Sequence, residues 1–188
     1  MSSDRDRLQL SSYSFPDELQ VDDLVIRGVI DDDIDTIAPA FMDPAVGGEA
    51  GLPAVGPEML RRALQHQIPQ MRAEGAMAPY VIDQGGVLLG GTTLHHLDAM
   101  RDTVEVGYWL IVEARGRGVA TRAVGAMVDD AFARGILRVE AHVRPENTAS
   151  VRVLERLGFE REGTKRKLLR HGGRRVDADL FARVAPGA

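Results

Sequence analysis

The segment Glu113-Ala-Arg-Gly-Arg-Gly-Val-Ala-Thr-Arg122 decides the fold, because it joins an apolar strand-like run at residues 104–112 to a helix-like run at residues 119–132. Within it, Gly116 and Gly118 lack a Cβ, so the backbone can turn sharply and come close to a ligand. The first N–H groups of the following helix have no partner within that helix and point at any negative group placed there. The segment therefore predicts a site for phosphate or pyrophosphate between a strand and a helix.

The glycine spacing separates three kinds of nucleotide-binding loop. A P-loop has Lys and then Ser or Thr after its last glycine, whereas this chain has Val119 and Ala120, so a P-loop nucleotidase is excluded. The dinucleotide fingerprint needs a third glycine, where this chain has Thr121, and an acid about 20 residues further on, near Glu140. Because strand-like sequence continues past Glu140, a dinucleotide-binding oxidoreductase fragment stays as the weaker alternative.

The remaining pattern, Arg115-x-x-Gly118-x-Ala120, resembles the pyrophosphate loop of the GNAT-superfamily acetyl-CoA N-acetyltransferases. A second signature at residues 144–159 is similar to that family: Asn147 closes a strand, a short amphipathic helix follows, and a Gly-Phe pair starts the next strand. Residues 24–30 and 104–111 resemble the subgroup that contains ribosomal-protein alanine and serine N-acetyltransferases. The resemblance extends over roughly residues 24–184.

The order of elements predicts an α+β fold, with a strand–helix–strand crossover that carries the anion loop. The resemblance implies a GNAT-like mixed, mostly antiparallel twisted sheet of about seven strands flanked by about four helices. We expect residues 1–20 to form a flexible tail and residues 21–188 a single acetyltransferase domain. The expected strands lie near residues 23–29, 78–83, 87–96, 104–112, 137–144, 159–169 and 176–184, and the helices near 31–41, 57–72, 119–134 and 148–157.

Composition sets further limits. A chain of 188 residues with 44% hydrophobic residues is long enough for one sizeable core. The absence of cysteine excludes disulfides, thiolate metal sites and a cysteine nucleophile, and the acidic run at residues 31–35 is interpreted as a helix start, so no metal is expected. A net charge of −5 argues against nucleic acid, and the lack of a long apolar run or leader predicts a cytoplasmic protein without membrane contact. The oligomeric state is left open, a homodimer included.

The resemblance implies acetyl-CoA (coenzyme A) as the acyl donor and assigns its contacts to three places. Backbone N–H groups at the end of the strand before the loop would bind the thioester oxygen, and the loop with the helix start would bind the pyrophosphate. Asn147 and Ser150 would contact the cofactor from the next helix. The predicted cofactor-binding residues are Leu110, Ile111, Val112, Arg115, Gly116, Arg117, Gly118, Val119, Ala120, Thr121, Asn147 and Ser150.

The implied chemistry is direct attack of an amine on the acetyl thioester, without an acyl-enzyme. Many family members place a Tyr seven residues after the Asn, where this chain has Leu154. We assign the leaving thiolate's proton or hydrogen bond to Ser150, one helical turn beyond Asn147. The alternative is that Ser150 and Asn147 only cap the helix.

The general base is the least defined part of the prediction. Glu105 lies on the strand before the loop, but its spacing to the loop is one residue shorter than in relatives, which could place it on the other face of the sheet. Tyr108 is a second catalytic candidate. Trp109 and His95 are predicted to contact substrate, and His96 is a further candidate beside them.

The acceptor amine is predicted from energetics. At pH 7 an α-amine costs about 1.4 kcal/mol to deprotonate and a lysine about 4.6 kcal/mol. Without a strong base in view, we expect the α-amine of a peptide N-terminus or a small-molecule amine. The amine would enter between the helix at residues 57–72 and the basic loop at residues 170–175, where Arg174 is the predicted contact. A non-catalytic acyl-CoA-binding module is the other alternative.

Overall fold

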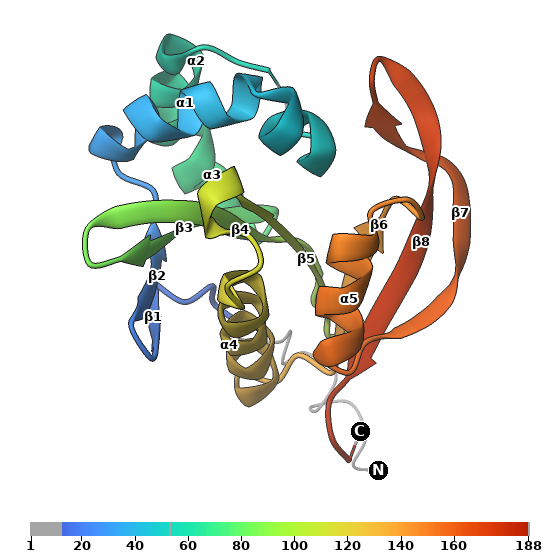
Figure 1. Cartoon of the computed structure of the whole chain (residues 1–188). Coiled ribbons are helices and arrows are strands. Elements are labelled where there is room, and N and C mark those ends of the chain that lie inside the picture. Colours follow the sequence, from blue (N-terminus) through green and yellow to red (C-terminus); the bar gives the residue numbers. More distant parts are fainter. Residues whose placement is uncertain (1–12, 53, 188) are drawn as a thin grey trace.

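A computed structural model describes residues 13–52 and 54–187 of the chain (Figure 1). Its centre is one eight-stranded mixed sheet in the order β1-β2-β3-β4-β5-β6-β8-β7, antiparallel throughout except for the parallel pair β5–β6. The strands are β1 Glu18–Val21, β2 Leu24–Gly28, β3 Met77–Gln84, β4 Val87–Asp98, β5 Thr103–Leu110, β6 Arg138–Val143, β7 Glu160–His171 and β8 Arg174–Val184. The helices are α1 Ile34–Met42, α2 Pro57–Arg62, α3 Ile68–Ala73, α4 Val119–Ala133 and α5 Thr148–Arg156.

The predicted α+β fold is confirmed, and the counts differ for two local reasons. Residues 18–21 form an additional edge strand, β1, which pairs with β2. The helix expected at residues 57–72 is divided by a π-helical turn, Ala63–Gln67, and is therefore counted as α2 and α3.

The predicted tail ends earlier than residue 20. Residues 1–12 lie outside the described residues. From there on the chain packs, since the rings of Tyr13 and Phe15 meet edge to face with centroids 5.6 Å apart and both are buried in the main core. Arg72 holds the same segment by donating to the backbone oxygen of Phe15 at 2.9 Å. From Tyr13 onward the chain therefore packs on the main core, because two aromatic side chains there are buried.

Alternate residues of β5 serve two different cores. Val104 and Val106 pack with Met127 of α4 in the main core on one face of the sheet, in front of which α4 and α5 lie (Figure 1). Trp109 points to the opposite face, where its ring meets Phe41 of α1 edge to face with centroids 5.4 Å apart. This alternation is the period-two pattern of a strand covered on both faces. It fixes β5 as the central element from which the site is built.

The parallel pair β5–β6 is short. Only residues 103–105 of β5 pair with residues 138–140 of β6, although β5 continues to Leu110 and β6 to Val143. Beyond this pairing the two strands are no longer bonded to each other, and residues 106–108 of β5 and 141–143 of β6 line an opening between them. In the described part of the chain, no helix is long and apolar enough to cross a membrane.

Gly91 of β4 provides a test of how tightly the sheet packs on Trp109. A Cβ at this glycine would lie 2.6 Å from Nε1 of Trp109 and 2.7 Å from the backbone oxygen of Tyr80. We expect Gly91→Ala to lower the free energy of unfolding by about 1–3 kcal/mol because the core is overpacked. Gly28→Ala is the matched control, since nothing lies within 4 Å of its Cβ position. Urea denaturation of both variants measures the difference, and equal losses would contradict this packing.

Candidate active site

The opening between β5 and β6 exposes backbone donors of β5. The N–H of Ile111 donates to the backbone oxygen of Leu89 at 3.0 Å, on the β4 side. Because N–H groups alternate in direction along an antiparallel strand, those of Leu110 and Tyr108 point the other way, toward the opening. Of the three donors predicted at residues 110–112, Leu110 is therefore the one placed for an oxyanion, and Ile111 is not.

The predicted anion loop has the geometry that its glycines require. Gly116 has φ +72° and Gly118 has φ +74°, a left-handed conformation that favours glycine. Gly118 is the N-cap of α4, and no side chain caps this helix start. The first helical bond runs from the N–H of Arg122 to the oxygen of Gly118 at 3.0 Å. The N–H groups of residues 119–121 thus have no acceptor within the helix, and they form a site for a negative group.

A groove of about 550 Å³ runs from this helix start to the opening in the sheet. Tyr108 and Trp109 of β5 also line it. Ile111, Val112 and Arg117 were predicted as cofactor contacts but do not line it. The predicted cofactor residues that do line it are Leu110, Arg115, Gly116, Gly118, Val119, Ala120, Thr121, Asn147 and Ser150.

The guanidinium groups of two loop arginines, Arg115 and Arg117, bind oxygen atoms of the protein. Arg115 donates to the backbone oxygens of Leu110 and Ala45, and Arg117 donates to Oε1 of Gln84 at 3.2 Å. Arg115 also lines the groove, but both guanidinium groups already bind protein oxygens, which leaves the backbone N–H groups at the start of α4 without an acceptor. The residues that sequence reasoning missed are Arg152 and Arg156 of α5, which line the groove. Their spacing of four residues on an amphipathic helix was the available signal, because it places both on one face.

The helix start at α5 brings the second signature to the same groove. Asn147 is the N-cap of α5, and its Oδ1 accepts the N–H of Ser150 at 3.1 Å. Asn147 therefore caps the helix, as the capping alternative predicts. Asn147 and Ser150 also line the groove. Tyr108 donates its hydroxyl to the backbone oxygen of Ser150 at 3.2 Å. Leu154 is buried and carries no proton to donate.

Tyr108 is a donor and not a base. Burial raises the pKa of its hydroxyl to about 12, against a smaller opposing effect of the hydrogen bond to Ser150. The phenol therefore stays protonated at neutral pH. The hydroxyl of Ser150 lies beside it, and the hydroxyl of Tyr108 would leave the Ser150 oxygen in order to donate to a ligand in the groove.

A second cavity, of about 150 Å³, lies on the other side of the opening and meets the groove. Its walls come from the loop after α1, from β6 and from the end of β7, including Glu49, His142, Arg144 and Arg170. Figure 1 shows the hairpin β7–β8 rising across from the segment that follows α1. The two hollows share the following lining residues: Glu49, Ala50, Tyr108, Asn147 and Ser150. A donor bound at α4 and an acceptor bound in this acceptor cavity would meet there.

The acceptor side differs from its prediction in two respects. Arg174 is exposed at the start of β8, opposite His171, and lines neither hollow. Among the described residues, none of α2 or α3 lines them either. The walls are formed instead by residues 49–51 and by Arg170, and the contact of His171 Nδ1 with the oxygen of Gly48 at 2.9 Å ties them together. Trp109 lines the groove but is mostly a core residue.

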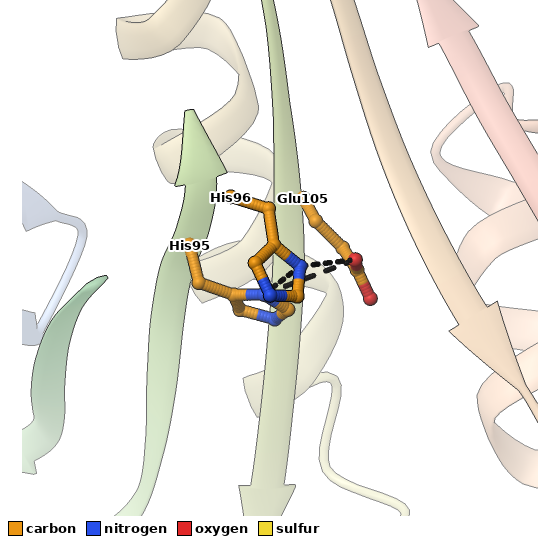
Figure 2. Close-up of side chains that lie close together, drawn as sticks. All are labelled: His95, His96 and Glu105. Carbon is orange, nitrogen blue, oxygen red and sulfur yellow. Dashed lines mark hydrogen bonds and ion pairs between the residues drawn. The ribbon is translucent and has the colours of Figure 1, made fainter. Parts of the chain in front are cut away.

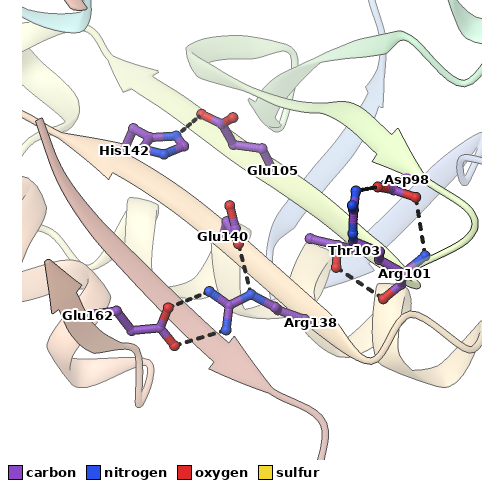
Figure 3. Close-up of polar contacts among 8 residues, drawn as sticks. All are labelled: Asp98, Arg101, Thr103, Glu105, Arg138, Glu140, His142 and Glu162. Atoms are coloured by element: carbon purple, nitrogen blue, oxygen red, sulfur yellow. Dashed lines mark hydrogen bonds and ion pairs between the residues drawn. The ribbon is translucent and has the colours of Figure 1, made fainter. Parts of the chain in front are cut away.

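Glu105 is held by histidines on the face opposite to α4. Its Oε1 lies 2.7 Å from Nδ1 of His142 (Figure 3), and its Oε2 lies 3.1 Å from Nδ1 of His96. Burial alone would raise the pKa of Glu105, but the hydrogen bond from His142, the charge of His95 and the contact with His96 outweigh it and lower that pKa to about 2. Glu105 is thus a carboxylate at any working pH, and sequence reasoning missed its partner His142.

Figure 2 shows how His95 and His96 meet at this carboxylate. The ligand-type atoms of His95, His96 and Glu105 all lie within 4.8 Å of one another, so the group is close enough to share a metal ion. His96 adopts φ +52°, which brings two consecutive histidines to one side of the strand. The two Nδ1 atoms lie 3.2 Å apart, within hydrogen-bond distance of each other. His95, predicted as a substrate contact, lines neither hollow.

Comparison with known proteins agrees with this geometry. An uncharacterized N-acetyltransferase of Bacillus licheniformis, p20, is 26% identical over 87% of this chain and 94% of its own length. The ribosomal-protein-serine acetyltransferase of Escherichia coli is 26% identical over 68% of this chain and 71% of its own. The structure of Mycobacterium smegmatis RimJ in complex with CoA-disulfide superposes with a TM-score of 0.77 at 26% identity, covering 86% of this chain and 82% of that one. Residues 23–160 match the acetyltransferase (GNAT) domain, and the chain therefore belongs to the GNAT family of acetyltransferases.

Proposed function

We propose that the protein transfers an acetyl group from acetyl-CoA directly to a primary amine, with the α-amine of a peptide N-terminus or of a small molecule as acceptor. One observation carries the proposal: the groove from the start of α4 and the acceptor cavity meet at Tyr108, Asn147 and Ser150. Two substrates that enter from opposite sides of the sheet can therefore react without a covalent enzyme intermediate.

The donor side fits acetyl-CoA through backbone groups. The free N–H groups at residues 119–121 would bind the pyrophosphate, since a helix start favours negative charge. Arg152 and Arg156 would add charge-assisted contacts from α5. The N–H of Leu110 or Tyr108 would donate to the thioester oxygen, where negative charge develops as the amine attacks.

The acceptor side favours an amine that is easily deprotonated. Arg170 lines the acceptor cavity beside the Arg144–Glu49 ion pair, and a positive charge nearby disfavours an ammonium ion. Because a lysine costs about 3 kcal/mol more to deprotonate than an α-amine, the same cavity suits the α-amine better. The E. coli relative that acts on ribosomal-protein serine supports a peptide N-terminus as one such acceptor. A cytoplasmic location would fit such substrates.

Turnover with a panel of amines tests the function and its alternative. We expect acetyl-CoA to be consumed with peptides that have a free N-terminal amine and no lysine, and hardly at all with N-terminally blocked lysine peptides. Release of the free thiol measures the rate. A preference for lysine would contradict the proposed acceptor, and acetyl-CoA binding without turnover on any amine would indicate a non-catalytic binding module.

Gly118→Asp tests the donor site. We expect it to weaken acetyl-CoA binding at least about tenfold, because it places a carboxylate where backbone N–H groups meet pyrophosphate. Gly135→Asp is the control, since Gly135 also has a positive φ, +97°, but follows the opposite end of α4. Calorimetric titration with acetyl-CoA separates the two variants. Equal affinities for both would remove the cofactor from this loop.

Ser150→Ala and Tyr108→Phe test the two hydroxyls near the leaving thiolate. We expect each to lower kcat by about 10-fold or more with little change in the KM for acetyl-CoA, because a donor to the thiolate acts mainly in the transition state. Tyr80→Phe is the control, since it removes a buried hydroxyl that donates to the oxygen of Pro16 at 2.8 Å, away from both hollows. If all three variants lose activity only in proportion to stability, the hydroxyls are structural.

A further inference from the structure

His142 lines the acceptor cavity, and one of its ring nitrogens has no hydrogen-bond partner. His142 of β6 has only 7% of its side chain exposed, and its Nε2 is buried without a hydrogen bond. Its Nδ1 lies 2.7 Å from Oε1 of Glu105 (Figure 3). A carboxylate can only accept, so a neutral imidazole here keeps its proton on Nδ1 and its lone pair on Nε2. A buried acceptor without a donor is uncommon in folded proteins and requires an explanation.

We propose that His142 is the general base that deprotonates the attacking amine, and that Glu105 is the positioning residue that fixes its tautomer. This inference rests on the proposed function and names a residue that performs part of it. His142 lines the acceptor cavity together with Tyr108, Asn147 and Ser150, and an amine N–H that reached Nε2 would supply the donor that this buried nitrogen lacks.

The geometry favours His142 over Glu105 itself. Glu105 lines neither hollow, and its oxygens are held by histidines, Oε1 by His142 and Oε2 by His96. A carboxyl whose pKa is lowered to about 2 is also a weak proton acceptor. Gly107 of β5 lines the same cavity, whereas Glu105 does not. His142 is therefore the better placed of the two groups.

Each proton that moves during acetyl transfer can be assigned to a group named above. An acceptor that binds as an ammonium ion gives one proton to Nε2 of His142, and the imidazolium that forms is stabilised by the carboxylate of Glu105. The amine lone pair then forms the nitrogen–carbon bond, and the carbon–sulfur bond breaks with its electron pair on sulfur. The second proton lost by the nitrogen ends on the thiolate, which the hydroxyl of Ser150 or Tyr108 stabilises meanwhile. His142 returns its proton to solvent after the products leave.

Steady-state kinetics of the intact protein test this role. We expect His142→Gln to lower kcat by about 100-fold or more, the usual contribution of a general base, while the affinity for acetyl-CoA stays within about threefold. His142→Ala leaves a hollow, and added imidazole should restore part of its kcat. Glu105→Gln should lower kcat less, and the double variant should be no slower than His142→Gln, because Glu105 acts through His142.

His66→Gln is the control for loss of a histidine, since His66 is exposed on the helix at residues 57–73, away from both hollows. It should keep the wild-type kcat. A His142→Gln variant within about threefold of the wild-type kcat, or losses at Glu105 and His142 that simply add, would overturn the inference while the acetyltransferase function stands. A wild-type protein without turnover on any amine would remove the proposed function, and this inference with it.

Discussion

The short pairing of β5 with β6 is the constraint on which the rest of this protein depends. Two neighbouring parallel strands would normally bond along their whole length, yet here only residues 103–105 and 138–140 do so. The remaining backbone of β5 is held from the β4 side alone. As a result, its outward N–H groups are available to a ligand, and the sheet can be entered from both faces. The groove and the acceptor cavity both exist because of this separation.

Backbone groups take a larger part in the site, and loop side chains a smaller part, than the sequence predicts. The loop arginines that the sequence offered as phosphate ligands bind protein oxygens instead, as Arg115 does at Leu110 and Ala45. The negative ligand is left to a helix start whose geometry two glycines create. On the acceptor side, too, a charged side chain acts indirectly, because Glu105 contacts His142 and not the acceptor.

The parts that could be predicted from sequence are those determined locally. Gly116, Gly118 and the apolar run after them indicate a loop and a helix start whatever the rest of the chain does, and the order of strands gave the α+β sheet. His142 could not be found, because its significance comes from Glu105, which lies 37 positions away in sequence. The walls of the acceptor cavity could not be found from sequence for the same reason, since residues 49–51 and Arg170 lie far apart in the chain. The burial of Tyr13 and Phe15 likewise depends on contacts that no local pattern reveals.

The contact between His171 and Gly48 has a consequence for the evolution of acceptor specificity. It joins two segments from distant parts of the chain, and these segments wall the acceptor cavity without forming the helix start that would receive the donor. Substitutions at the end of β7, which lines the acceptor cavity but not the groove, can therefore reshape what is accepted while the donor half is inherited unchanged. A gene duplicate could thus acquire a new acceptor in a few steps, whereas a change of donor would require rebuilding the centre of the sheet.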